Sequence, residues 1–302
     1  MNLGLLLISD PRSPSPVSPP LLASVEVVGY DPRMYPILLQ IGPITIYSYG
    51  VMMALGFLAA NWVVGKGLQY QGKDPNFSST LVMWAAVGGI LGARFLFIVE
   101  RLPEFFTDPL SMIFTGAGFT WYGGLIGGVV GVTLCIWRHK MSWLEVMDAV
   151  APGIALGHGI GRIGCHLAGD GDWGPPTTLP WGVAYTKAII GWDYPPGVRV
   201  HPSALYETIA YTLIFAILWR YRTVPRATGS LFWGYLLLSS FARFLIEFVR
   251  INPPLAFGLS EAQVISLIFM TIGAVMLLRR TGTTPATEIM PPLNRVAREK
   301  QR

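Results

Sequence analysis

Seven long apolar stretches constrain this chain more than any other feature of its sequence. Each approaches the ~20 residues that a helix needs to cross a bilayer, and only 13% of the chain is charged, against about 25% in soluble domains. None alternates apolar and polar residues as a membrane β-strand does. We therefore predict an all-α integral membrane protein with seven transmembrane helices. We place them at about 47–65, 79–99, 118–137, 143–168, 204–221, 229–250 and 262–278.

The distribution of basic residues predicts the orientation of these helices. The loops after the first, third and fifth stretches, together with the C-terminal tail, hold most of the Lys and Arg residues that lie outside the stretches. Basic loops stay on the cytoplasmic side of a membrane. We therefore expect the N-terminus outside, the C-terminus in the cytoplasm, and the loop at about 169–203 on the outer membrane surface.

The rest of the chain predicts a simple domain organisation. Residues 1–35 are rich in Pro and Ser, and we expect a disordered tail there. Residues 36–282 form one transmembrane domain, and 283–302 a basic cytoplasmic tail. The net charge of +5 suits a protein facing anionic lipid. It is too modest and too scattered to indicate nucleic acid as a partner.

The fourth stretch carries polar residues where lipid makes them costly. A charged group inside a span costs at least ~2.5–3.5 kcal/mol. At 100° per residue, one helix face holds His158, Arg162, Cys165 and His166, and Asp148 falls on it too. Two interpretations stand open here. Arg162 pairs with Asp148 or extends to the membrane surface, or this face is a polar site.

Arginines also lie inside two other stretches. Arg243, Glu247 and Arg250 follow one another at i, i+4 and i+7, so their surplus positive charge needs an anion. Phosphate matches arginine in bidentate geometry. Arg94 has no acid at helical spacing on its N-terminal side. The arginines predict a site for an anionic phospholipid reached from the membrane, or for a water-soluble organophosphate reached through a pore.

Several motifs in order resemble those of the prolipoprotein diacylglyceryl transferases. The resemblance covers about 36–280, which is nearly all of the membrane part. The motifs are SYG at 48–50, LGAR at 91–94, WYGGLIGG at 121–128, GRIGCHLAGDGDWG at 161–174 with PWGVAY after it, HPSALYE at 201–207 and RFLIEFVR at 243–250.

The resemblance implies a reaction in the bacterial inner membrane. The diacylglyceryl group of phosphatidylglycerol passes to the thiol of a lipobox cysteine in a prolipoprotein, a thioether forms, and glycerol 1-phosphate leaves. By the same resemblance, Arg162 and Arg243 bind the phosphate and stabilise the leaving group, and Glu247 holds Arg243. The residues expected to contact or shape the lipid site are Tyr49, Arg94, Arg162, Cys165, Asp170, Gly174 and Arg250.

Three departures from the family pattern concern the base that removes the thiol proton. Tyr122 stands where many members have a histidine, and a tyrosine with a pKa near ~10 is a poorer base. Cys165 replaces an asparagine, and an additional residue separates Asp170 from Trp173. We therefore name His166 as a substitute base, because imidazole transfers protons near neutral pH. An interfacial hydrogen-bonding role for His166 is equally open.

Other functions remain as alternatives. No P-loop or dinucleotide fingerprint appears, and Cys165 and His166 are adjacent with no partner pair at metal-ligand spacing, so we expect no metal or cofactor. We expect structural roles for His158 and His201. A transporter for an anionic solute is the alternative from another class, but the chain shows no internal repeat of the kind common in transporters. A diverged transferase with another acceptor or lipid, or an inactive paralogue, also fits the three departures.

Overall fold

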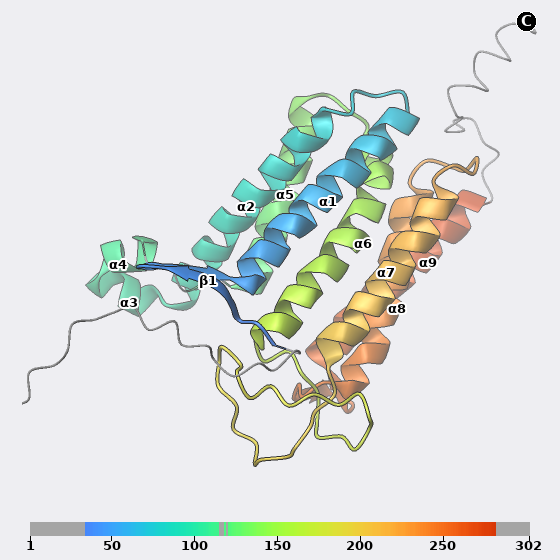
Figure 1. Cartoon of the computed structure of the whole chain (residues 1–302). Coiled ribbons are helices and arrows are strands. Elements are labelled where there is room, and N and C mark those ends of the chain that lie inside the picture. The colour runs from blue at the N-terminus through green and yellow to red at the C-terminus, as the bar shows by residue number, and fades with distance from the viewer. Residues whose placement is uncertain (1–33, 115–117, 119, 282–302) are drawn as a thin grey trace, which may run out of the picture. The chain divides into compact units, whose positions relative to one another are not determined.

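A computed structural model of the chain describes residues 34–114, 118 and 120–281, and the described part is mostly helical (Figure 1). Each of the seven predicted stretches corresponds to a long helix. These helices are α1 (Ser48–Tyr70), α2 (Phe77–Glu100), α5 (Trp121–Arg138), α6 (Trp143–Ala168), α7 (Ser203–Tyr221), α8 (Ser230–Ile246) and α9 (Glu261–Thr281). Nearly all of the predicted tails at 1–35 and 283–302 lies outside the described residues.

Four helices in the described part of the chain are long and apolar enough to cross a membrane. They are α1, α2, α9, and α8 with the short 3-10 helix η1 (Glu247–Val249) that continues it. The long helix α6 is not among these four, and it carries Glu145, Asp148 and Arg162. The charges that distinguish α6 from an ordinary span lie in the protein interior or at its two ends.

The prediction of an all-α fold is incomplete, because the chain also forms two antiparallel β-hairpins. One joins β1 (Ile37–Ile41) to β2 (Ile44–Tyr47), and the other joins β3 (Pro254–Ala256) to β4 (Leu259–Ser260). Two short helices, α3 (Leu102–Thr107) and α4 (Pro109–Phe114), follow α2. These elements are too short and too local to appear as helix-period patterns, so hydropathy alone does not reveal them.

Small residues let the long helices approach closely. Figure 1 shows α2 beside α5 and α1 beside α6, and these two pairs have the most extensive contacts. A Cβ added at Gly127 of α5 would overlap with the carbonyl oxygen of Gly88 on α2. Only glycine permits this backbone contact, which is how small residues stabilise helix pairs in lipid.

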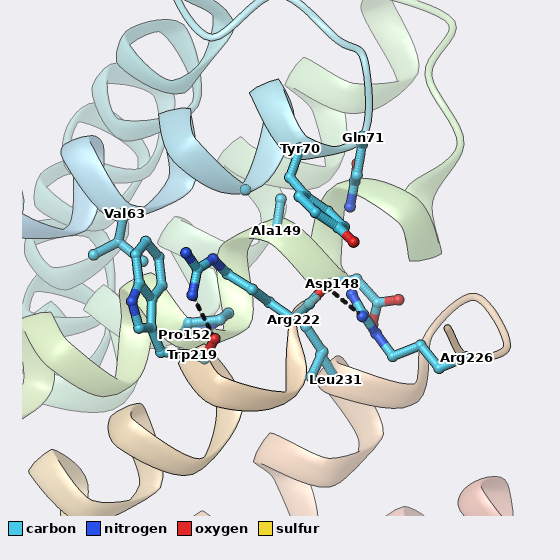
Figure 2. Close-up of a pocket in the computed structure, with 11 residues that line it drawn as sticks. Val63, Tyr70, Gln71, Asp148, Ala149, Pro152, Trp219, Arg222, Arg226 and Leu231 are labelled. Atoms are coloured by element: carbon cyan, nitrogen blue, oxygen red, sulfur yellow. Dashed lines mark hydrogen bonds between the residues drawn. The ribbon is translucent and has the colours of Figure 1, made fainter. Parts of the chain in front are cut away.

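The amino-terminal half of α6 fixes the start of α8. The buried carboxylate of Asp148 accepts hydrogen bonds from the backbone N–H groups of Gly229 (2.7 Å) and Phe232 (2.9 Å). These groups have no partner within α8, so Asp148 caps the helix from outside. Figure 2 shows Asp148 in this region with Arg222 and Arg226, which follow α7.

This arrangement excludes the pairing of Arg162 with Asp148. The two residues are separated by 14 positions on one helix, which is roughly 21 Å at 1.5 Å per residue. They share a helical face, but they lie near opposite ends of α6.

The long loop between α6 and α7 has a small core of its own. Tyr185 and Val200 are 2% and 0% exposed, and they pack with Val183 and with Met34 near the start of the described chain. Trp173 stacks on Tyr185 with ring centroids 5.0 Å apart. This core holds the loop against the end of α6.

Candidate functional site

A cluster of charged side chains lies where the end of α6, the start of α7 and the end of α8 meet. Its centre is Glu207, on the first turns of α7, whose side chain is 0% exposed. A buried carboxylate needs positive or hydrogen-bonding partners. Arg162 of α6 supplies the shortest contact, with Nε 2.7 Å from a carboxylate oxygen of Glu207.

Two further arginines reach the same carboxylate from the end of α8. Arg243 and Arg250 each place a guanidinium nitrogen 3.2 Å from the second oxygen of Glu207. His158, one turn before Arg162, places Nε2 3.3 Å from the oxygen that Arg162 contacts. Glu207 therefore joins residues of three helices through one carboxylate.

Asp172 brings the loop after α6 into the cluster. It forms ion pairs with Arg162 and with Arg250, and its backbone carbonyl accepts a 2.6 Å hydrogen bond from the hydroxyl of Ser203. Burial by itself raises the pKa of Asp172, but the charges and hydrogen bonds of the two arginines outweigh this and hold the pKa below its usual range. Asp172 is therefore ionised at neutral pH.

Glu247 holds the far side of Arg243. One of its oxygens lies 2.9 Å from an Arg243 nitrogen. The other accepts hydrogen bonds from Asn252 (2.6 Å) and from the hydroxyl of Ser260 (2.7 Å). The side chain of Glu247 is 1% exposed, so its position is fixed by buried partners.

The surplus positive charge that the sequence predicts at the end of α8 is compensated within the protein. Glu207 and Asp172, which are distant from α8 in the sequence, supply the negative charge that Glu247 alone does not. Arg243 is the most accessible arginine of the cluster, with a side chain 24% exposed, against 15% for Arg162 and 10% for Arg250. Arg243 is thus best placed to meet an anion from outside.

An open hollow of about 480 Å³ lies beside the end of α6. It is lined by Tyr47, Tyr49, Gly50, Ala168, Asp170 and Ile189. Asp170 joins this hollow to the arginine cluster, because it accepts a 3.2 Å hydrogen bond from the backbone N–H of Asp172. The walls are mostly apolar, and Asp170 adds a charged group to them, as is typical of ligand sites.

The sulfur of Cys165 and carboxylate oxygens of Asp170 and Asp172 lie within 4.8 Å of one another. The carboxylate of Asp172 is already engaged by two arginines, and Arg162 lies 3.8 Å from the sulfur. Arg162 and Arg250 thus already supply positive charge to Asp172.

Comparison with known proteins agrees with the motifs. Residues 36–279 match the family model of prolipoprotein diacylglyceryl transferase. The chain belongs to this family. Two relatives named phosphatidylglycerol–prolipoprotein diacylglyceryl transferase come from Clostridium tetani (34% identical, 80% of this chain and 95% of the relative) and Azotobacter vinelandii (34%, 82% and 94%). A third, with the same name numbered 2, comes from Clostridium perfringens (36%, 79% and 92%).

Most of the residues that resemblance to the transferase family singled out lie together. Arg162, Arg243, Glu247 and Arg250 belong to the charged cluster. Tyr49 and Asp170 line the hollow, and the sulfur of Cys165 lies 3.8 Å from Arg162 of the cluster. Gly174 packs the loop against η1, because a Cβ there would overlap with the carbonyl oxygen of Val249.

Arg94 and Tyr122 have other partners. Arg94 donates a 3.1 Å hydrogen bond to the carbonyl of Gly118 and lies over the ring of Phe97. The hydroxyl of Tyr122 donates to Glu261 (3.1 Å), next to the Ser260 that binds Glu247. Tyr122 is therefore at the edge of the cluster rather than in its centre.

His166, one turn after Arg162 on α6, contacts the loop that follows the helix. Its Nδ1 is 2.9 Å from the hydroxyl of Tyr185, and its side chain is buried against that ring. Burial raises the pKa of Tyr185, so its hydroxyl stays protonated. This contact favours the hydrogen-bonding interpretation of His166.

Sequence reasoning did not assign a site role to three members of the cluster. Glu207 lies in the HPSALYE motif, yet nothing in its spacing shows that it meets Arg162. Asp172 is the carboxylate that pairs with the arginines, although Asp170 is the one that the resemblance singled out. His158 was expected to have a structural role, although it lies one turn from Arg162.

Proposed function

We propose that this chain transfers the diacylglyceryl group of phosphatidylglycerol to the thiol of a lipobox cysteine in prolipoproteins, forming a thioether and releasing glycerol 1-phosphate. The observation that carries the proposal is the convergence of Arg162 and Arg243 on Glu207 in a chain that matches the transferase family over 36–279. Relatives bear the name of this activity. The cluster's chemistry, arginines beside an open apolar hollow, suits an anionic lipid.

In this proposal Arg243 and Arg162 bind the lipid phosphate and stabilise the charge that develops on the departing group. Fixed donors aimed at developing charge are the largest single contribution in many enzymes. Arg243 already pairs with Glu207 and Glu247. A phosphate that binds Arg243 would therefore share this guanidinium with the two carboxylates. The carboxylates thereby hold the arginines in place before the lipid arrives, which lowers the reorganisation needed for catalysis.

The other predicted residues receive supporting roles. Tyr49 and Asp170 line the lipid site, Cys165 packs between this site and Arg162, and Gly174 and Arg250 hold the loop after α6. Arg94, Tyr122 and His166 remain candidates in the proposal, with Tyr122 and His166 as potential proton acceptors. Arg94 contacts Gly118, Tyr122 contacts Glu261, and His166 contacts Tyr185.

We further propose that the protein crosses the bacterial inner membrane seven times, with its N-terminus outside and its C-terminus in the cytoplasm. The seven long helices and the basic loops support this topology. It puts the arginine cluster and the loop after α6 on the outer side, where secreted prolipoproteins present their cysteine.

A transfer assay tests the function directly. The purified full chain is mixed with phosphatidylglycerol and a lipobox peptide, and the peptide mass is followed. We expect a mass gain equal to one diacylglyceryl group. Mild alkali should then remove the two ester-linked acyl chains and leave the glyceryl group on the peptide, because a thioether resists hydrolysis. A control peptide with Ser in place of the lipobox Cys should gain nothing. No mass gain by the folded chain would contradict the proposal.

The same assay separates the alternatives. A diverged transferase would modify another acceptor or use another phospholipid, so phosphatidylethanolamine and phosphatidylserine are tested in parallel. An anionic-solute transporter would leave the peptide unmodified and move glycerol phosphate into vesicles instead.

A further inference from the structure

The proposed reaction needs Arg162 to bind a phosphate, but the donors of this arginine are already engaged. A phosphate binds arginine most strongly through two N–H groups at once, and any such pair includes either Nε or Nη1 of the guanidinium. In Arg162, Nε lies 2.7 Å from Glu207. Nη1 donates to Asp172 and lies 3.8 Å from the sulfur of Cys165. A phosphate that binds Arg162 therefore competes with these two carboxylates for the guanidinium.

Asp172 is the easier of the two carboxylates to displace. The side chain of Glu207 is 0% exposed, and its oxygens lie within 3.3 Å of His158 and of three arginines. The side chain of Asp172 is 28% exposed, and its ion-pair partners are Arg162 and Arg250. The more exposed and less connected carboxylate is the one that an incoming anion replaces at the lower cost.

The carboxylate of Asp172 is bound as a phosphate would be. Its Oδ2 accepts from Arg162, and its Oδ1 accepts from Arg250. Two guanidinium groups that each bind a separate oxygen of one anion are suited to phosphate as well as to carboxylate. A carboxylate oxygen of Asp172 also lies within 4.8 Å of one of Asp170, which lines the hollow. The headgroup of a lipid in the hollow is thus close to this position.

We propose that the lipid phosphate binds between Arg162 and Arg250, at the position of the Asp172 carboxylate, and that Asp172 is an internal competitor which the lipid displaces. The inference rests on the proposed transferase function. Asp172 belongs to GDGDW at 169–173, the segment with an additional residue between Asp170 and Trp173. The competitor therefore lies where this chain departs from the motif of the family that it resembles.

The contacts of the loop allow the side chain of Asp172 to move while its backbone stays in place. The backbone carbonyl accepts a 2.6 Å hydrogen bond from the hydroxyl of Ser203, and the backbone N–H donates to Asp170 at 3.2 Å. Rotation about the side-chain bonds releases the two arginines and breaks neither contact. The arginines keep Glu207 as a partner, so they remain aligned when the carboxylate leaves.

This competition lowers the affinity for the lipid. A site that is free only part of the time has an apparent dissociation constant raised by the inverse of that fraction. If Asp172 occupies the arginines about nine tenths of the time, the lipid binds about tenfold more weakly than it would bind free arginines. The same ion pairs stabilise the folded loop, so stability and affinity are opposed at Asp172.

Asp172→Asn tests the proposal, because asparagine has nearly the same shape but no negative charge. Binding of glycerol 1-phosphate to the full chain in detergent is measured from the rise in unfolding temperature, and the transfer assay gives KM for phosphatidylglycerol. We expect Asp172→Asn to lower both the Kd for glycerol 1-phosphate and this KM about tenfold. Asp193→Asn is the matched control, because it removes the same charge from an exposed position on the same loop. It should change neither constant.

A purely structural role for Asp172 predicts the opposite result. Equal or weaker binding of glycerol 1-phosphate by folded Asp172→Asn overturns the inference, as does an equal gain in Asp193→Asn, which would show general repulsion of anions. If Asp172→Asn does not fold, Asp172→Ser is measured in the same way, and failure of both to fold overturns the inference.

The two readouts separate this inference from the proposed function. No transfer by the folded parent chain overturns the proposed function. Transfer by the parent chain, with unchanged binding of glycerol 1-phosphate in Asp172→Asn, overturns the inference alone.

Discussion

A buried carboxylate lies near each end of α6, and the two carboxylates are stabilised by different kinds of partner. Each end meets a buried carboxylate, Asp148 at 1% exposure near one end and Glu207 at 0% near the other. Asp148 is satisfied by backbone N–H groups of α8, and Glu207 by the side chains of Arg162, Arg243 and Arg250. A backbone partner cannot leave without unfolding a helix turn, whereas a guanidinium can turn toward a substrate phosphate. The first end is therefore a scaffold, and the second is suited to be a site.

Glu207→Gln should produce the largest effect at the arginine end. Removing one member of a buried ion-pair network leaves uncompensated charge, which costs about 3–5 kcal/mol. We expect thermal unfolding in detergent to shift strongly downward and transfer to be lost. Glu145→Gln is the matched control, because Glu145 pairs with Lys73 in a more exposed contact (28% and 24%) worth about 0–1 kcal/mol. Equal shifts in both variants would count against a central role for Glu207.

Asp148→Asn should have a smaller effect, and of a different kind. The amide can accept at only one of its two positions, so one buried N–H of α8 loses its partner at a cost of about 1–3 kcal/mol. We expect a lower unfolding temperature with an unchanged transfer rate per folded molecule. A rate that falls while the protein stays folded would show that this end also takes part in the reaction.

Tyr185→Phe tests whether His166 only holds the loop or also takes part in the reaction. The substitution removes the hydrogen bond to His166 and keeps the ring that stacks on Trp173, so we expect a loss of about 0.5–1.5 kcal/mol in unfolding free energy. Transfer should stay close to that of the parent chain if His166 only holds the loop. A large drop in rate, with stability preserved, would assign His166 a part in the chemistry.

Acid should weaken the arginine end through Asp172. Its pKa is lowered in the folded protein, so its contribution to stability is fully present above the unfolded value of about 3.9 and is lost as pH falls through the folded pKa. We expect the difference in unfolding temperature between the parent chain and Asp172→Asn to be constant from pH 8 to pH 5. It should shrink only below about pH 3.9. A difference that vanishes between pH 5 and 7 would mean that Asp172 is not held by Arg162 and Arg250.

Helical periodicity predicted the members of the site that share a helix. Arg243 and Glu247 were expected to pair at i and i+4, and they lie 2.9 Å apart. The seven long helices were also predicted, because a run of apolar residues near the thickness of a bilayer is a local signal. Within one helix, the sequence alone was sufficient.

Contacts between helices were not predictable in the same way. Arg162 shares a helical face with Asp148, yet its partners are Glu207 and Asp172, from α7 and from the preceding loop. Periodicity gives the direction of a side chain but not the neighbour that receives it. The two hairpins were missed because strands of two to five residues carry too little pattern.

A single comparison of rates tests the difference between the two ends of α6 most directly. Transfer of the diacylglyceryl group is measured with Arg162→Ala and Asp148→Asn, each normalised to folded protein. We expect Arg162→Ala to lose roughly 10²–10³-fold in rate, the effect of removing one donor to a developing anion, while Asp148→Asn keeps the parent rate. Retention of the parent rate by folded Arg162→Ala would contradict a phosphate-binding role for the arginine cluster.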